Sequence, residues 1–596
     1  MIRLPQNSSG ASPAKPEGGS EAPDSLRLPL ILSASAGAMI PLGFDPWGLA
    51  FLMPLAFMIL ALATDRCGFR RSLLLGWVFG LGVQGASLPW ITLAAKNYLG
   101  IFVLDDPGSL SAWAAGIGLF LVWWPLSSLG WGFCLALVSL APEAPGTRQR
   151  IWKCLGIIIF VALYEQYWPR LFPWSVGSGL ATPEPSMGWV LLRQWGVEVA
   201  SLVIAGSGFL AAHSFPLVFD FFDRRKRNLT LSRAWLLLPA CIVASLALIP
   251  FSNGGATPRI PDSSEEFVVS LIQPAIPLED RHGAKWLELN RKLVSWISAV
   301  EDDAEWVSEQ KEEGIRPLTV LPEGMIPGVH DPRSLRLWAQ QIQLEQPLLS
   351  GVMIETPEGY ANAVALLTPV EDERGVRDYS VEVGFKKDLV PFGERIPGES
   401  LFDLLGWKPP ITGLVAGEGP IVFKLDSSDS PFGVSICYEG LLPGTSGGLQ
   451  ESGAEWHVNV TEDLWYGEFL EPAQHLQLQR SRSIESCLPL LRCTNAGHTV
   501  AFDPRAFGQQ TFIAYRSLTN GPSEWQPIES AGEWSLHEEI GKPGILQVRL
   551  RSEPQIQRGP LMPWPKAWAP IFGAFWIVAG LLRIVLQRQQ GLPRVD

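Results

Sequence analysis

The feature that most constrains this 596-residue chain is a series of long apolar runs near its beginning, with one more near its end. A helix needs about 20 apolar residues to cross the hydrocarbon core of a bilayer. Most of the runs approach that length, and the first two are shorter and can form a tight hairpin. The pattern predicts about eight membrane helices, near residues 28–43, 47–64, 72–94, 112–140, 151–168, 193–215, 233–251 and 567–586.

The charges between these runs predict the orientation of the helices. Basic residues gather after every second run, and the other connections are poor in positive charge, as at 95–111 and 169–192. Basic loops face the cytoplasm. We therefore expect both termini to be cytoplasmic and residues 252–566 to be extracytoplasmic. The basic clusters are Arg66 to Arg71, Arg148 to Lys153, Arg224 to Arg227, and Arg588.

The uneven distribution of charge divides the chain into segments. Residues 259–558 contain 45 acidic and 25 basic residues, whereas the rest contains 14 and 21. This contrast indicates a soluble domain joined to a basic membrane anchor. The chain shows no basic pattern of the kind that nucleic-acid-binding proteins use. The expected segments are a disordered cytoplasmic tail (1–25, rich in Ser, Pro and Gly), transmembrane helices (26–255), a soluble domain (256–558), and a C-terminal transmembrane helix with a short tail (559–596).

The soluble segment has the pattern of an α/β domain. Short β-branched or apolar runs alternate with helical patterns, and this alternation is typical of a layered fold. The helical patterns cover 286–302 and 472–486. The strand-like runs are FVVSLIQ (267–273), PLTVLP (317–322), PLLSGVMI (347–354), AVALLTP (363–369), FGVSIC (432–437), WHVNV (456–460) and LPLLRCTN (488–495).

Three reactive side chains stand at the ends of strand-like runs. Glu323 follows LTVLP, Lys386 follows VEVGF, and Cys437 ends FGVSIC. A nucleophile needs a base to take its proton and a positive group to hold the developing oxyanion. Glu, Lys and Cys supply these roles, but their spacing alone does not show that they meet, and Cys437 by itself could be an ordinary buried cysteine.

Other polar residues allow plainer interpretations. None of the seven cysteines forms a CxxC pair, so a zinc site is not expected. Cys487 and Cys493 are interpreted as core residues or, less often, as a disulfide. His475 lies on a helical pattern, where packing is expected rather than catalysis. Sequons begin at Asn228 and Asn459, and we discount both because such matches arise by chance.

The motifs around these residues resemble a known family. LPEG around Glu323, KKDLVPFGE from Lys386 to Glu394, and ICYE (436–439) are similar to the three motifs of the nitrilase, or carbon-nitrogen hydrolase, superfamily. The membrane helices and the VPFGE run narrow the resemblance to the apolipoprotein N-acyltransferase family. The resemblance spans essentially residues 28–586 and includes 461–505, with DLWYG, LLRCTNAG and DPR.

The resemblance implies a fold and catalytic roles. It implies a transmembrane bundle of about eight helices joined to an extracytoplasmic αββα sandwich. Glu323 would be the general base, Lys386 the oxyanion stabiliser and Cys437 the nucleophile. Lys386 is preferred over Lys387 because it stands eight residues before Glu394, the spacing of the family.

The resemblance also implies supporting residues. Glu394 and Glu439 match further acidic positions of the family site, which orient the lysine or the substrate amine, and Tyr438 and Asn362 match positions near the pocket. The chain departs from the family at 461–463, where Thr-Glu-Asp replaces Ser-Asn-Asp. We expect this change to alter the rim of the pocket rather than to abolish activity.

The segment 396–420 has two interpretations. Its apolar residues can form a helix packed on the core, or an amphipathic lid that lies on the bilayer and admits acyl chains. The resemblance favours a mobile lid. The lid residues would be Leu401, Phe402, Leu404, Leu405 and Trp407.

The reaction implied by the resemblance is a two-step acyl transfer. A phospholipid acyl chain would pass through a thioester on Cys437 to the α-amino group of the lipidated N-terminal cysteine of an apolipoprotein, the diacylglyceryl-modified acceptor. No metal or organic cofactor is implied. The implied location is the bacterial inner membrane, with the catalytic domain on the periplasmic side. Two alternatives stay open: a membrane-tethered amidase that hydrolyses a C–N bond, and an inactive lipoprotein-binding scaffold.

Overall fold

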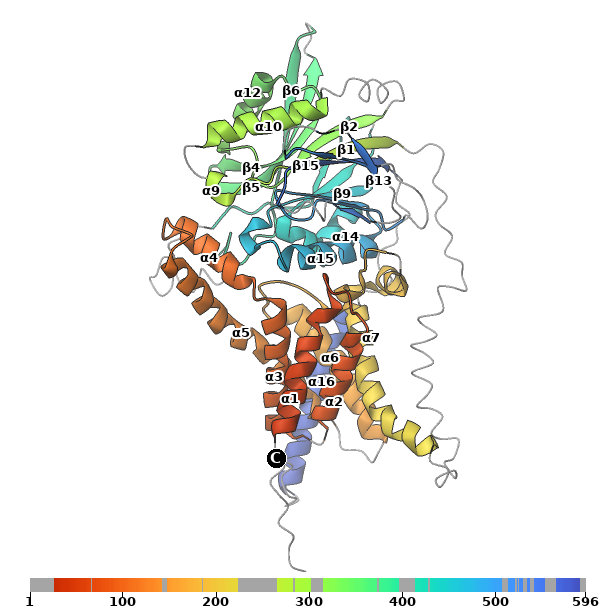
Figure 1. Ribbon diagram of the computed structural model, residues 1–596. Helices are drawn as coiled ribbons and strands as arrows, with labels where there is room; N and C mark the ends of the chain where they lie inside the picture. Colours follow the sequence, from red (N-terminus) through yellow and green to blue (C-terminus); the bar gives the residue numbers. More distant parts are fainter. Residues whose placement is uncertain are drawn as a thin grey trace, which may run out of the picture.

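A computed structural model shows a bundle of helices below a domain of two packed sheets (Figure 1). All structural statements concern the residues that it describes. These are 26–65, 67–141, 147–184, 186–222, 265–281, 285–301, 315–371, 375–395, 413–426, 429–505, 513–519, 523, 525–528, 533–535, 541–552 and 564–589. The expected tail at 1–25, the apolar run at 233–251 and the lid residues 401–407 lie outside these ranges.

The described helices of the bundle contain the apolar runs of the sequence other than 233–251. Its core is lined with aromatic and aliphatic side chains, among them Phe57, Phe79 and Trp131, whose rings pack within 6.0 Å of one another. The helices are α1 (Arg27–Met39), α2 (Leu52–Ala63), α3 (Phe69–Ser87), α4 (Ile91–Phe102), α5 (Leu110–Val138), α6 (Thr147–Tyr167), α7 (Met187–Phe222) and α16 (Trp564–Gln589), with the 3-10 turns η1 (Pro41–Gly43) and η2 (Val176–Leu180).

Two of the described helices are long and apolar enough to cross a membrane, α5 and residues Met187–Ala212 of α7. A third span arises if α3 and α4 act together, but they are bent by 60° at the break between them. The expectation of one continuous span at 72–94 is therefore wrong. Pro89 explains the break, because proline disfavours helical backbone in the residue before it and removes a hydrogen-bond donor. Helix α4 instead continues into the expected loop 95–111.

The domain above the bundle contains two mixed sheets. The first has the strand order β13 (Gln526–Ile528), β12 (Ile513–Ser517), β15 (Gly544–Arg551), β1 (Glu266–Gln273), β2 (Arg316–Leu321), β4 (Leu348–Thr356), β5 (Gly359–Glu371), β6 (Arg377–Phe385), with β3 (Val329–His330) beside β4. The second has the order β14 (Glu533–Ser535), β11 (Val500–Phe502), β10 (Leu490–Thr494), β9 (Trp456–Thr461), β8 (Phe432–Ile436), β7 (Ile421–Phe423).

The sheets pack face to face and are covered by helices on their outer faces. Side chains of both sheets share one core, in which Phe267 of the first sheet contacts the stacked pair Phe432 and Trp456 of the second. Helices α10 (Trp286–Glu301) and α12 (Pro332–Ile342) cover the first sheet, with the short α9 (Leu278–Arg281) nearby. Helices α14 (Pro443–Glu451) and α15 (Glu471–Ser486) cover the second. The layers are therefore αββα, as expected.

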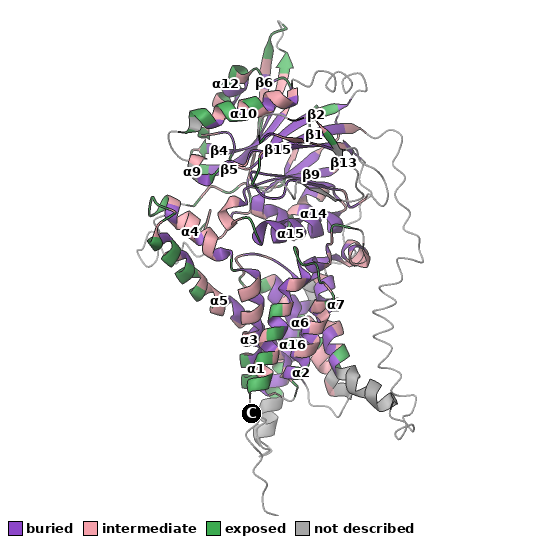
Figure 2. Ribbon diagram, viewed as in Figure 1, coloured by how far each residue is buried: buried purple, intermediate pink, exposed green. Residues whose placement is uncertain are grey.

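Helix α15 joins the sheets to the bundle. All sixteen of its residues are buried although its sequence is mostly polar (Figure 2). Its polar side chains bond to the helical part, since Arg480 Nη1 lies 3.0 Å from Asp45 Oδ2 and 2.8 Å from the carbonyl of Ala181. Buried polar groups are tolerated where they find such partners. The interface is thus polar, and it holds the second sheet over the end of the helical bundle.

Candidate active site

Glu323 follows strand β2, and a glycine on the neighbouring strand gives its loop room. Gly351 of β4 donates its N–H to Pro322 O at 3.0 Å and accepts from Met325 N at 2.9 Å. A Cβ at position 351 would lie 2.4 Å from the Glu323 Cα, closer than side chains come to backbone. The absence of a side chain at position 351 therefore lets the backbone of Glu323 lie against β4, and this contact determines the position of Glu323.

Lys386 follows β6, and its ammonium group is completely buried between two carboxylates. Its Nζ lies 2.9 Å from Glu394 Oε1 and 3.4 Å from Glu323 Oε1. Burial disfavours the ammonium, but the two carboxylates outweigh burial and raise the pKa of Lys386. Burial likewise opposes ionisation of Glu394, but Lys386 holds its pKa below the ordinary value. Lys386 is therefore a permanent positive charge in a low-dielectric site.

Asn362 of β5 links the two carboxylates. Its Nδ2 donates to Glu323 Oε1 at 2.7 Å and to Glu394 Oε1 at 2.8 Å, and both of its amide hydrogens are used. Its backbone carbonyl accepts from Lys386 N at 2.9 Å. Asn362 therefore holds the spacing between the two acids and anchors the residue that stands between them.

Cys437 stands at the end of β8, on the first residue of the turn η5 (Cys437–Leu441). Its φ of 52° lies in the left-handed region, which costs a non-glycine residue about 1–3 kcal/mol. Burial and the negative charge of Glu323 raise the pKa of its thiol well above the ordinary value, although Lys386 opposes this shift. The resting side chain is therefore a thiol, which needs a base before it can attack.

Glu439 ties the turn of Cys437 to the loop of Lys386. Its Oε1 accepts from the backbone N–H groups of Lys387 (2.7 Å) and Asp388 (3.0 Å), and its Oε2 accepts from that of Ile436 (2.9 Å). The side chain is buried, and burial raises its pKa despite these donors. One carboxylate thus joins the strand end that precedes the thiol to the segment that follows the ammonium group.

The helical bundle reaches the rim of the site through α4. Tyr98 Oη donates to Gly393 O at 2.8 Å, beside Glu394. Asn97 donates to the carbonyls of Leu464 and Trp465 in the turn η6 (Leu464–Tyr466). Tyr438, the residue after the cysteine, packs against the core of the helical bundle. The candidate site therefore lies at the boundary between the sheets and the helices.

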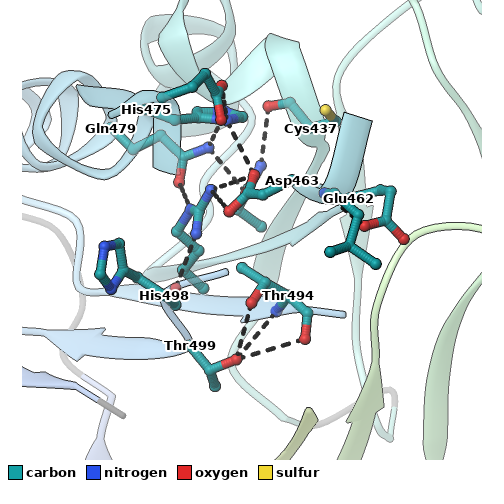
Figure 3. Close-up of polar contacts among 12 residues, drawn as sticks. Cys437, Glu462, Asp463, His475, Gln479, Thr494, His498 and Thr499 are labelled. Atoms are coloured by element: carbon teal, nitrogen blue, oxygen red, sulfur yellow. Dashed lines mark hydrogen bonds and ion pairs between the residues drawn. The ribbon is translucent and has the colours of Figure 1, made fainter. Parts of the chain in front are cut away.

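Asp463 and His475 lie in a buried polar cluster near the cysteine (Figure 3). Arg492 Nη2 donates to both oxygens of Asp463 at 2.9 Å. Burial opposes the charge of Asp463, but Arg492 outweighs burial and lowers the pKa. His475 Nδ1 lies 3.3 Å from Asp463 Oδ1 and 3.1 Å from Glu471 Oε1. The interpretation of His475 as a plain packing residue is therefore incomplete, because it belongs to an ionisable cluster.

Asp463, Glu471 and His475 are also the described residues whose ligand atoms lie close enough together to hold a metal ion. The guanidinium of Arg492 already contacts both carboxylate oxygens of Asp463. The fit to a cation is therefore poor, because the ion would have to displace or repel a buried positive charge.

The structure brings most of the expected residues together. Glu323, Lys386, Asn362, Glu394 and Glu439 are joined by hydrogen bonds around the turn of Cys437 or act on its pKa. The expected lid lies outside the described residues. Cys487 and Cys493 do not form the possible disulfide.

Sequence reasoning missed a second set of polar residues. Asn459, discounted as a chance sequon, is fully buried in β9 and donates to the carbonyl of Cys437 at 3.3 Å. Gln479 and Arg492 stand behind it. One signal was available: Arg492 is a charge inside an apolar strand, and such a charge requires a buried partner.

The chain is similar in sequence to known proteins. The chain matches the family described as carbon-nitrogen hydrolase over residues 269–516. Curated apolipoprotein N-acyltransferases from Geobacter metallireducens and Brucella melitensis are 26% and 28% identical, over 80% and 74% of this chain and 86% and 78% of theirs. The crystal structure of Saccharomyces cerevisiae Nit3, of the nitrilase superfamily, is 16% identical and covers 46% of this chain and 92% of its own, with a TM-score of 0.29.

Residues 269–516 therefore match the carbon-nitrogen hydrolase family, and this segment contains Glu323, Lys386 and Cys437. The similarity to curated apolipoprotein N-acyltransferases extends beyond this segment, over about four-fifths of the chain.

Proposed function

We propose that this enzyme transfers a fatty acyl chain from a membrane phospholipid, through a thioester on Cys437, to the α-amino group of the lipidated N-terminal cysteine of apolipoproteins. The observation that carries the proposal is the buried Lys386 ammonium, held between Glu323 and Glu394. The charges of Glu323 and Lys386 also act on the pKa of the Cys437 thiol. This arrangement supplies a base, a nucleophile and a fixed positive charge, which acyl transfer needs.

In the first half-reaction, Glu323 accepts the proton of the Cys437 thiol. The thiolate attacks the ester carbonyl carbon of the phospholipid, and a C–S bond forms. Lys386 stabilises the oxyanion of the tetrahedral intermediate, as do backbone N–H groups. The intermediate collapses when the C–O bond breaks, and the lysophospholipid oxygen takes the proton from Glu323. The acyl chain remains as a thioester.

In the second half-reaction, the α-amine of the acceptor attacks the thioester carbonyl. Glu323 takes the proton of the attacking amine, the C–N bond forms, and the C–S bond breaks. The thiolate of Cys437 recovers its proton from Glu323. A thioester suits this order because it retains the acyl chain yet reacts with an amine, and the two substrates react in ping-pong order.

We further propose that the protein is a multi-pass enzyme of the bacterial inner membrane. Residues 26–255 and 559–596 would hold the anchor, and residues 256–558 would form the catalytic domain on the periplasmic side, with both termini cytoplasmic. The alternation of basic loops supports this orientation. The exposed apolar side chains of α5, such as Leu110 and Val122, support contact with lipid. Both substrates are lipids, so a site at the end of the bundle shortens their path.

The experiment is to incubate the purified protein with an acyl-labelled phospholipid and to search for a thioester by peptide mass spectrometry. We expect the adduct on Cys437, its transfer to a lipopeptide amine, and its loss in Cys437→Ala. Cys487→Ala is the matched control, because Cys487 is also a cysteine with a left-handed φ, of 56°. It should retain wild-type transfer.

Three outcomes contradict the proposal. Transfer by Cys437→Ala would remove the nucleophile. Release of free fatty acid or ammonia instead of N-acylated peptide would favour the amidase alternative. Binding of lipopeptide by the wild type without any thioester would favour the scaffold alternative.

A further inference from the structure

A chain of buried hydrogen bonds runs from Arg492 to the backbone of the nucleophile. Arg492 Nε donates to Gln479 Oε1 at 2.9 Å, and Gln479 Nε2 donates to Asn459 Oδ1 at 2.9 Å. Asn459 Nδ2 donates to Cys437 O at 3.3 Å and to Ser435 Oγ at 2.9 Å. Helix α15 and strands β8, β9 and β10 each contribute a member of this chain, which lies on the helix side of the second sheet (Figure 3).

The chemistry of the donors fixes the direction of every bond. Arginine has donors only, so the oxygen of Gln479 must face Arg492 and its NH₂ group must face Asn459. The oxygen of Asn459 is then turned toward Gln479, and its NH₂ group is turned toward Cys437 and Ser435. Arg492 thereby orients an amide that it does not touch.

Two buried histidines are compatible with this direction. His475 Nε2 lies 3.0 Å from Gln479 Nε2 and accepts from it in the tautomer that carries its proton on Nδ1, toward the acids Asp463 and Glu471. Ser435 Oγ accepts from Asn459, so its hydroxyl hydrogen points to His457 Nε2 at 2.7 Å in the tautomer that leaves this nitrogen unprotonated. Burial lowers the pKa of His457 to about 4, so its ring is neutral at pH 7.

The last bond of the chain falls on the strained residue of the site. Cys437 has a φ of 52°, which its side chain disfavours, so the turn needs interactions that hold it. In a trans peptide the carbonyl of Cys437 and the N–H of Tyr438 point in opposite directions. An anchor on that carbonyl therefore also aims the Tyr438 N–H, a backbone donor beside the thiol, away from Asn459.

We propose that Gln479, oriented by Arg492, is a positioning residue for the nucleophile. Through Asn459 it holds the carbonyl of Cys437, and so it sets the direction of the thiol and of the neighbouring N–H donor. The proposal rests on the proposed function for the role of Cys437. Gln479 itself touches no reacting atom, and its effect passes entirely through the amide of Asn459.

The test compares two variants of Gln479 in the full-length protein in detergent. Gln479→Met keeps the length and loses all the hydrogen bonds. Gln479→Glu keeps an oxygen toward Arg492. Its second oxygen replaces the NH₂ group that donated to Asn459 Oδ1, so this hydrogen bond is lost. We measure the rate of Cys437 alkylation by iodoacetamide against pH, by peptide mass spectrometry, together with the single-turnover rate of thioester formation and the melting temperature. Both variants should slow alkylation and thioester formation by about tenfold or more, with an unchanged half-saturating phospholipid concentration.

The matched control is Gln547→Met. Gln547 is buried in β15 of the other sheet and donates to Ser270 Oγ at 3.1 Å, so its loss also removes a buried hydrogen bond. It should lower the melting temperature but leave the alkylation rate of Cys437 within about twofold of wild type. A loss of stability in the other sheet does not reorient the turn of Cys437.

The outcomes separate this proposal from the acyl transfer itself, because alkylation requires no acyl donor. Wild-type alkylation rates in both Gln479 variants would overturn the positioning role, and so would an equal loss of rate in Gln547→Met. If the Gln479 variants slow alkylation but the wild-type protein forms no thioester, the positioning role is upheld and the acyl transfer is rejected.

Discussion

Replacement of Glu439 by glutamine tests whether one carboxylate holds the two halves of the site together. The carboxylate accepts two backbone N–H groups on Oε1 and one, from Ile436, on Oε2. A glutamine has a single oxygen, which can keep the pair from Lys387 and Asp388. Its NH₂ group then faces the N–H of Ile436. Two hydrogen-bond donors face each other there, and the hydrogen bond from Ile436 N is lost.

The magnitude follows from that one lost contact. Removing the acceptor of a buried donor costs about 1–3 kcal/mol, and the cost is larger where the acceptor is charged. We expect a loss of about 2–3 kcal/mol, located between the strand end before Cys437 and the loop after Lys386. If the loss falls on the transition state, the rate decreases by about 30- to 160-fold, since each 1.36 kcal/mol is a factor of ten.

The assay is the single-turnover rate of thioester formation on Cys437, measured by rapid quench at saturating phospholipid, with the melting temperature recorded for each variant. Glu451→Gln is the control, because Glu451 is an exposed residue at the end of α14 in the same layer. A rate for Glu439→Gln within about threefold of the control would refute the idea that this carboxylate sets the geometry of the site.

Two further predictions concern neighbouring residues. Gly351→Ala places a Cβ 2.4 Å from the Glu323 Cα, so it should lower the melting temperature and slow thioester formation by about tenfold or more. Glu394 has a pKa held below its ordinary value of 4.5 by Lys386, against burial, so its stabilising contribution is present above pH 4.5 and is lost as the pH falls below it. Glu394→Gln should be less stable at neutral pH and should lose less stability on acidification.

The controls for these two predictions are direct. Gly447→Ala adds a Cβ in helix α14, where nothing lies within 4 Å, and should leave both the melting temperature and the rate near wild type or slightly above. Unfolding by denaturant between about pH 3 and 6 measures the acid dependence. Parallel stability curves for wild type and Glu394→Gln across this range would contradict the assigned ion pair.

Local sequence patterns were sufficient to predict most of the elements. The strand-like runs at 432–437 and 456–460 correspond to β8 and β9, and the helical patterns at 286–302 and 472–486 correspond to α10 and α15. Strand and helix periods act over a few residues, so they can be detected in a single chain. The prediction failed at 72–94, where the apolar run continues but Pro89 breaks the helix.

The sequence by itself determined the apolar anchor, the α/β class of the remainder and the positions of Glu323, Lys386 and Cys437, because hydrophobicity and motifs are properties of neighbouring residues. Only the tertiary structure decided how polar groups far apart in the chain are satisfied. Asn459 and Gln479 have ordinary sequence surroundings. Asn459 donates to the carbonyl of Cys437, and Gln479 donates to Asn459 because α15 packs on the second sheet. A buried polar group requires a partner, but the sequence does not state which residue the fold will bring to it.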